Sequence, residues 1–289
     1  MSSYISNRQV SRDHAESVSL PLLLSAPQLV MQQRLFNDSF EFGSLLQDSY
    51  ELYNPTEQEE SYMLMPSGCM TMIFQLHDSV SSARLCGPLT TMRQLRIPSG
   101  GTLFCVRLRP GCGEWLISGG VSTLTDNTAP LSQYLPGCNY LLDQLRRGES
   151  FHERNVLLLR LLNAQDALAY RPAPLLRSCL EMIAESHGQI HVSELAEHAG
   201  CSERYLNRIF RDKVGISTKT QCELTQLQYS LHSILTTRPK SLLHTAVACG
   251  YFDQAHMNRH YRKFLFCTAN DMRSANNRTV PCEEIPFVV

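Results

Sequence analysis

The 289-residue sequence has no long hydrophobic run, no strong net charge and no closely spaced pair of cysteines. Without about 20 consecutive apolar residues no membrane span is expected, and the N-terminus lacks the charged-then-apolar layout of a signal peptide. We therefore expect a cytoplasmic protein. The 11 cysteines include no Cys-x-x-Cys pair, and in a reducing compartment scattered thiols serve mainly as small buried hydrophobic residues. A thiol-based redox sensor is the main alternative.

The sequence also lacks the motifs of common enzyme classes. It contains no Gly-x-x-x-x-Gly-Lys-Ser/Thr loop and no Gly-x-Ser-x-Gly elbow, and the two glycines around Cys112 lack the third glycine of a dinucleotide fingerprint. The histidine pairs His187/His191 and His256/His260 have the spacing of zinc ligands, but neither has the accompanying glutamate or a third ligand nearby. We expect no catalytic residue, no metal and no cofactor. An enzyme is an alternative function, but no catalytic motif supports it.

Residues 61–170 predict a β-rich domain that ends in helices. Short apolar runs such as 70–74 and 103–108 follow Pro-Ser-Gly turn signals, which is typical of strands. Leucines at helical spacing predict helices within 139–170, and one run, 156–162, is apolar on more than one face. That run would pack inside its own domain or against a second copy of the chain. Residues 1–60 carry no clear pattern.

Two arginines and the single tryptophan are the candidate effector-binding residues. In the strand at 103–108 the alternation places Arg107 and Arg109 on one face. Inside a small barrel these arginines would hold an anionic ligand, whereas on an open sheet they would face solvent. Trp115 follows in the same region. The alternative to an effector-binding role is that Trp115 lies in the core of this domain or at the rim of the core.

Residues 172–275 predict an all-helical domain. A proline-rich break at 171–174 ends the preceding helix, since proline cannot continue it. This segment has 12 Lys and Arg against 9 Asp and Glu, a net charge of +3, while the remainder of the chain has a net charge of −4. The asymmetry has the sign expected for binding to nucleic acid. Residues 276–289 would form a C-terminal tail.

A helix-turn-helix pattern spans residues 192–210. The first helix ends at Gly200, and Ser202 is a good N-cap for the second. The apolar residues of the second helix form one stripe, which leaves its polar face outward. Arginine and asparagine suit the edges of guanine and adenine in a major groove. The outward side chains of this kind are Arg204, Asn207 and Arg208.

The pattern recurs at residues 242–264, after a helical run at 221–235 of about 22 Å. Gly250 makes the second turn. Two units held by one helix would enter successive major grooves about 34 Å apart without dimerisation. The outward face of the second unit carries Gln254, Ala255, Asn258 and Arg259.

Together the two units resemble the C-terminal domain of the AraC/XylS family of bacterial transcription regulators. The resemblance covers residues 172–275. Its two signatures are Leu195-Ala196 through Ser202, Leu206, Arg208 and Phe210, then Val214-Gly215-Ile216-Ser217; and Gly250-Tyr251 through Asp253-Gln254, Met257, Arg259, Tyr261-Arg262-Lys263 and Thr268. It implies that the outward residues of both units face DNA. The chain departs from the usual family pattern at four positions. It has Thr245 in place of an apolar residue, Met257 in place of Phe, Phe266 in place of Gly and Ala269 in place of Pro.

The N-terminal half resembles an uncharacterised domain found ahead of some AraC-type DNA-binding halves. The matches include Pro66-Ser67-Gly68, Gly87-Pro88-Leu89-Thr90 and Val106-Arg107-Leu108-Arg109-Pro110-Gly111. Such halves are often cupin-like, and they bind an effector or mediate dimerisation. The resemblances thus imply an α+β protein with a β-rich, cupin-like N-terminal domain and flanking helices, then an all-α domain of two helix-turn-helix units joined by a linker helix.

The function expected from these features is sequence-specific DNA binding in transcription regulation. The expected partners are double-stranded DNA, a small-molecule effector, RNA polymerase and a second copy of the chain, with no membrane. Two alternatives stay open beside the enzyme. One is the thiol-based redox regulator, and the other is a ligand-binding or protein-interaction module whose helix-turn-helix units no longer bind DNA tightly.

Overall fold

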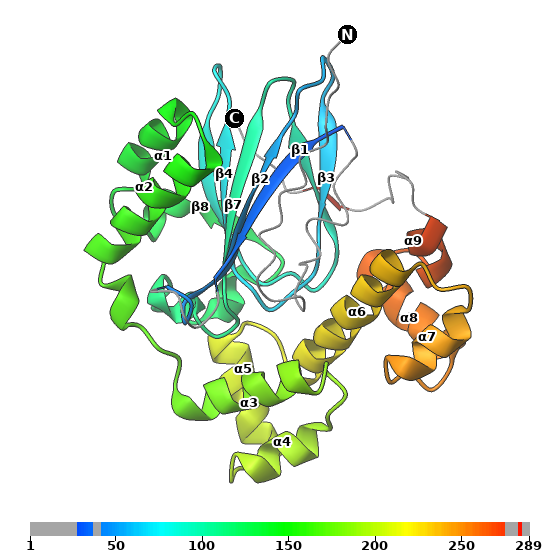
Figure 1. The fold of residues 1–289 in the computed structure, drawn as a ribbon. Helices are drawn as coiled ribbons and strands as arrows, with labels where there is room; N and C mark the ends of the chain where they lie inside the picture. Colours follow the sequence, from blue (N-terminus) through cyan, green and yellow to red (C-terminus); the bar gives the residue numbers. More distant parts are fainter. Residues whose placement is uncertain (1–27, 37–41, 275–282, 285–289) are drawn as a thin grey trace.

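A computed structural model describes residues 28–36, 42–274 and 283–284. Figure 1 shows a β-rich N-terminal domain with two helices along one side and a helical C-terminal domain beneath it. The predicted fold class, a β-rich domain with flanking helices followed by two helix-turn-helix units, is confirmed. None of the helices in the described segments is long and apolar enough to span a membrane.

Two sheets form the N-terminal domain. The larger has six antiparallel strands in the order β1-β2-β7-β4-β5-β8, and the smaller has the order β3-β6-β9, with β9 parallel to β6. The strands are β1 (Val30–Leu35), β2 (Leu46–Tyr53), β3 (Glu60–Leu64), β4 (Thr71–Leu76), β5 (Ser82–Cys86), β6 (Arg93–Ile97), β7 (Thr102–Leu108), β8 (Thr128–Pro130) and β9 (Glu283–Glu284).

Strands β1 and β2 lie before residue 61, in a segment whose sequence predicts no structure. β2 is a central strand and is buried on both faces over most of its length. Its buried residues include Asp48 and Ser49, so the apolar alternation of a half-exposed strand is missing. The sheet therefore begins earlier in the chain than its apolar runs indicate.

The alternation predicted for β7 is confirmed. Phe104 and Val106 point toward the helices and join their core, whereas Leu103 and Cys105 join the core between the two sheets. Both faces of this central strand are buried. An arginine placed on either face is therefore buried as well.

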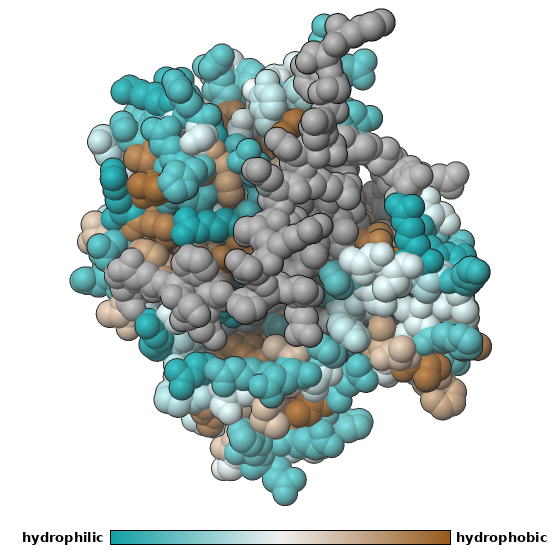
Figure 2. All heavy atoms as spheres, viewed as in Figure 1, coloured by the Kyte–Doolittle hydropathy of each residue, from teal (hydrophilic) through white to brown (hydrophobic). Residues whose placement is uncertain are grey.

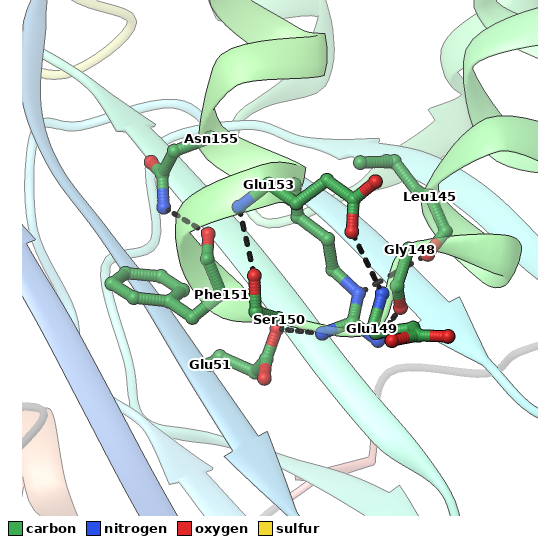
Figure 3. Close-up of polar contacts among 9 residues, drawn as sticks. Glu51, Leu145, Gly148, Glu149, Ser150, Phe151, Glu153 and Asn155 are labelled. Atoms are coloured by element: carbon green, nitrogen blue, oxygen red, sulfur yellow. Dashed lines mark hydrogen bonds and ion pairs between the residues drawn. The ribbon is translucent and has the colours of Figure 1, made fainter.

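Helices α1 (Cys138–Arg147) and α2 (Phe151–Ala164) cover the outer face of the larger sheet. Figure 3 shows the contacts at the start of α2, where the Ser150 side chain accepts a hydrogen bond from the backbone N–H of Glu153. The Arg154 guanidinium donates to the backbone oxygens of Leu145 and Gly148 and pairs with Glu51 of β2 at 2.8 Å. This arginine ties the end of α1 and the start of α2 to the sheet.

The C-terminal domain contains seven helices within residues 172–274. They are α3 (Pro174–Glu185), α4 (Val192–His198), α5 (Glu203–Lys213), α6 (Thr218–Thr237), α7 (Leu242–Ala248), α8 (Gln254–Leu265) and α9 (Ala269–Ser274). The linker helix α6 has 20 residues and so measures about 30 Å. It is longer at both ends than the run at 221–235 that the sequence predicts. Short 3₁₀ turns in the N-terminal domain include η2 (Gly113–Trp115) and η3 (Val121–Leu124).

Candidate DNA-binding surface

The first helix-turn-helix unit consists of α4 and α5. Leu206 and Phe210 of α5 are fully buried, as their spacing predicts. The Ser202 hydroxyl accepts a hydrogen bond from the backbone N–H of Tyr205, so Ser202 caps the helix. Gly200 has a φ of +62°, a left-handed conformation that glycine adopts without strain, and it ends α4.

The second unit repeats this construction with α7 and α8. Met257 and Tyr261 are fully buried, and the Asp253 carboxylate caps α8 by accepting from the N–H of His256 at 2.6 Å. Gly250 ends α7 with a φ of +78°. The two caps, Ser202 and Asp253, are 51 residues apart. The same offset therefore relates equivalent positions of the two recognition helices.

One asparagine in each recognition helix fixes the turn that follows it. The Asn207 side-chain oxygen accepts from the N–H of Thr218 at 3.1 Å, and the Asn258 oxygen accepts from the N–H of Ala269, also at 3.1 Å. Both are half-buried. The structure assigns the amide oxygens of Asn207 and Asn258 to the next helix, and the DNA-facing roles that the sequence predicts for these two residues stay predictions.

The predicted arginines lie on the surface. Arg204 and Arg208 of α5 and Arg259 of α8 are exposed, as is Ala255, while Gln254 is half-buried. Since Arg208 and Arg259 are 51 residues apart, they occupy the same position in the two units. The Arg208 guanidinium lies 4.9 Å from the ring centre of exposed Tyr205. The two units thus present a guanidinium at one shared position.

The N-terminal domain contacts the end of the first recognition helix. Lys213 of α5 forms an ion pair with Glu114 of η2, and hydrogen bonds to Glu114 and Asp212 raise the pKa of Lys213. The Thr125 hydroxyl donates to the backbone oxygen of Gly215 at 2.7 Å. A Cβ at Gly215 would lie 2.9 Å from Pro88 and from the Thr125 hydroxyl, so this contact needs glycine.

The same domain also contacts the linker helix and the second unit. Gln228 of α6 donates to the backbone oxygen of Pro66 at 2.7 Å, and the N–H of Met92 donates to the backbone oxygen of Phe264 in α8 at 2.9 Å. Met65 and Met92 belong to the core of the helical domain. Both units are therefore fixed to one N-terminal domain. These contacts have no signal in the sequence, because they join ordinary residues far apart along the chain.

Arg107 and Arg109 have structural roles. Arg107 is 7% exposed, and its guanidinium pairs with the fully buried Asp48 carboxylate, with Nε–Oδ1 at 2.7 Å and Nη2–Oδ2 at 2.5 Å. Burial lowers the pKa of Arg107, but Asp48 more than offsets this effect and raises the pKa overall. Arg109 donates to the backbone oxygens of Gly43 and Phe36. These contacts favour structural roles for both arginines over binding of an anionic effector.

The third candidate effector residue, Trp115, packs partly buried against the core under the helices. It lies in η2, next to the Glu114 that contacts α5. This is the core or rim position that the sequence offers as an alternative. A structural role therefore accounts for Trp115.

Nine of the ten cysteines in the described part of the chain are buried, and Cys201 is half-buried. Burial raises the pKa of the Cys86, Cys112, Cys222 and Cys267 thiols to about 12 and the pKa of Cys138 and Cys249 to about 11. Such thiols stay protonated and unreactive at neutral pH. Cys282 lies outside the described residues.

The paired histidines have no third ligand placed beside them in the described part of the chain. Residues 28–36, 42–274 and 283–284 contain no group of three or more side chains placed to hold a metal ion. The rings of His256 and His260 lie edge to face, with centroids 4.9 Å apart. Burial is the main cause that lowers the pKa of His260 to about 4, and His256 contributes while Glu223 opposes it. His260 is therefore neutral at pH 7.

Comparison with protein families finds a domain model in each half of the chain. Residues 195–275 match a "Helix-turn-helix domain" model of the AraC type. Residues 48–130 match a "Domain of unknown function (DUF6597)". No curated protein matches the chain.

Comparison with solved structures finds low overall similarity. ToxT from Vibrio cholerae is 7% identical with a TM-score of 0.41, and the match covers 86% of this chain and 99% of ToxT. A structure of ToxT from Vibrio cholerae with bound unsaturated fatty acid is 9% identical with a TM-score of 0.40, covering 83% and 96%. The C-terminal domain of AraT, a response regulator from Geobacillus stearothermophilus, is 19% identical with a TM-score of 0.34, covering 38% of this chain and 93% of that domain.

Proposed function

Because residues 195–275 form an AraC-type helix-turn-helix domain, we propose that this chain is a sequence-specific DNA-binding transcription regulator that reads one duplex with both of its units. The observation that carries the proposal is the repeated geometry, in which Arg208 and Arg259 are exposed at one position of two matching helices. The 30 Å linker helix α6 is close in length to the roughly 34 Å of one turn of DNA. This length supports the proposal that one chain reaches two neighbouring major grooves.

Direct readout by Arg208 is tested on duplexes that the full-length protein selects from a random pool. Arg208→Ala should weaken binding to a selected duplex by about five- to 150-fold, as expected for one lost bidentate contact to guanine. Binding to an unrelated duplex should change much less. The control is Arg177→Ala on α3, an exposed arginine that pairs with Glu181, which should leave both affinities unchanged.

Two results contradict this proposal in different ways. If Arg208→Ala lowers specific and non-specific binding equally, Arg208 contacts only phosphates. If the protein selects no sequence and binds no duplex at any salt concentration, the chain is not a DNA-binding regulator, and the alternative of a ligand or protein-interaction module is favoured.

We further propose that the N-terminal domain modulates DNA binding. Its support is that the domain holds the end of α5 through Thr125 and the end of α8 through Met92, so a shift of the domain would change the spacing of the units. Gly215→Ala should disturb the α5 contact, since its Cβ would overlap Pro88, and should change DNA affinity at least twofold. Unchanged affinity with an unchanged fold would contradict modulation through this contact.

A pocket between β1 and α2 is the place where we propose that a small-molecule effector binds. Its volume of about 300 Å³ is at the lower end of the range for ligand sites. The pocket is lined by Arg34, Phe36, Phe42, Val156, Leu159, Arg160 and Asn163. Any compound that raises the melting temperature of the wild type should fail to do so in Leu159→Trp, where the added ring fills the pocket. Equal shifts in both proteins would place the effector elsewhere.

RNA polymerase is a proposed protein partner, supported by an apolar patch on α7. Leu243 and Val247 are 49% and 59% exposed, and Figure 2 shows apolar residues on the surface over α7, at the lower right. The corresponding residues of α4 are the polar Ser193 and Glu197. Replacing both apolar residues with the polar pair of α4 should lower transcription activation in vitro without changing DNA affinity. Unchanged activation would remove this support.

Two further proposals are a second copy of the chain as partner and a redox-active thiol. The leucines at 156–162 all pack to some extent against their own domain, so dimerisation is tested by sedimentation, where a monomer at micromolar concentration would refute it.

For redox sensing, Cys201 is the most accessible described thiol. Oxidant-dependent DNA binding that Cys201→Ser abolishes would support that alternative, and oxidant-independent binding would contradict it.

A further inference from the structure

The turn of the second helix-turn-helix unit contains one more residue than the turn of the first. The N–H of Cys201 donates to the backbone oxygen of Ala196, and the N–H of Tyr251 makes the same bond to Ala246. Cys201 and Tyr251 are thus equivalent at an offset of 50. The helix caps that follow are equivalent at an offset of 51, so Phe252 is the extra residue and has no counterpart in the first unit.

Phe252 is the most exposed large hydrophobic residue in the described part of the chain, at 87%. Its position in the turn is fixed, because its N–H donates to Nδ1 of His256 at 3.4 Å while the N–H of His256 donates to the Asp253 cap. Phe252 therefore lies directly before the cap of α8, with its ring exposed to solvent. The N-terminal end is the end that a recognition helix presents to the bases.

The first turn of α8 also differs in chemistry from the first turn of α5. Ala255 is exposed and occupies the position of Arg204, 51 residues earlier. Arginine at this position can donate two hydrogen bonds to guanine, whereas alanine and phenylalanine have only apolar surface to offer. In the major groove the apolar group that distinguishes one base pair from the others is the C5 methyl of thymine.

We propose that the two units read different bases: Arg204 and Arg208 of the first unit contact guanines, whereas Phe252 and Ala255 of the second unit form an apolar surface that contacts thymine methyl groups. The proposal rests on the proposed DNA-binding function and deepens it. The shared guanidinium of Arg259 would hold the second helix in register beside this surface. The recognised site is then directional, with a guanine-containing half and a thymine-containing half.

The test uses full-length protein and a duplex that it selects from a random pool. Thymidine is replaced by deoxyuridine, which lacks only the C5 methyl, in one half of the site at a time. We expect a loss of about fourfold in affinity for each contacted methyl in the second half, the amount expected for one buried carbon. In the first half we expect no change. Arg204→Ala identifies that first half, since it should relax the preference for guanine there alone.

Variants of the second unit complete the test. Phe252→Ser should lose the sensitivity to deoxyuridine while keeping non-specific affinity and melting temperature, because the ring is almost fully exposed. Ala255→Arg should shift selection in the second half toward guanine. Equal affinity for the thymidine and deoxyuridine duplexes, or unchanged sensitivity in Phe252→Ser, would overturn the inference. Failure to select any duplex would instead overturn the underlying DNA-binding proposal, so the two failures are distinguishable.

Discussion

Removing the buried carboxylate of Asp48 should destabilise the N-terminal domain strongly. Asp48 is completely buried, and its carboxylate accepts two hydrogen bonds from Nε and Nη2 of Arg107 and a third from Gln33 at 2.7 Å. Asp48→Asn removes the charge with almost no change in volume. The variant therefore leaves a buried cation without its counter-ion while packing stays the same.

The expected loss in the free energy of unfolding is about 3 kcal/mol. Breaking a buried ion pair by removing one partner costs about 3–5 kcal/mol, and the asparagine oxygen that remains keeps the cost near the lower end. An exposed ion pair contributes about 0–1 kcal/mol. Glu59 and Arg96 form such a pair, with side chains 49% and 55% exposed. Glu59→Gln is thus the matched control, with an expected change below about 0.5 kcal/mol.

Urea unfolding followed by tryptophan fluorescence measures this effect. Trp115 is the only tryptophan and packs in the same domain, so its emission reports on that domain. Circular dichroism at 222 nm follows the helices in parallel. If Asp48→Asn fails to fold, the double variant Asp48→Leu with Arg107→Met should restore folding, because apolar pairs of similar volume replace buried ion pairs well. A loss no larger than that of Glu59→Gln would refute the structural role assigned to Arg107.

Three further predictions concern the helical domain. Asn258→Ala and Asn207→Ala should each lower stability by about 0.5–2 kcal/mol in thermal unfolding, as expected for a lost cap. Both variants should keep the base preference of the wild type in site selection, and a changed preference would support the DNA-facing role instead. Phe266 is 47% exposed and has a φ of +58°, at the position where the first unit has Gly215 with a φ of +90°. Glycine adopts this left-handed conformation without strain, so Phe266→Gly should raise the melting temperature, by a stabilisation of up to about 1 kcal/mol. A lower melting temperature would show that Phe266 is not strained. The pKa of His260 is about 4 in the folded protein and about 6.5 in the unfolded chain, so the folded protein should lose stability as the pH falls from 6.5 to 4. In urea unfolding across that window, the wild type should lose about 1–3 kcal/mol more than His260→Asn. An equal pH dependence of the two proteins would refute this prediction.

The helical domain was the part most open to prediction from sequence. Its helices are amphipathic, so Leu206, Phe210 and Met257 show their burial through spacing alone. Glycine turns and side-chain caps at Ser202 and Asp253 then fix where the helices begin and end. These are local signals, which is why both units were recognisable.

The candidate site was predictable only in part, because exposure on a helix face does not reveal partners from elsewhere in the chain. Asn207 and Arg208 are adjacent and polar, yet Asn207 bonds to the start of α6 while Arg208 stays exposed. In the β-rich domain Arg107 follows the alternation of its strand, but Asp48 lies 59 residues earlier. Nothing local in the sequence marks such a pair.

The most direct test of the central claim, that one chain places two recognition helices on one duplex, is a hydroxyl-radical footprint at a selected site, together with native mass spectrometry of the same complex. The account predicts two protected backbone segments about one helical turn apart with one chain per duplex. Arg208→Ala should remove only the first segment and Arg259→Ala only the second. A single protected segment, or two segments that appear only with two chains bound, would contradict it.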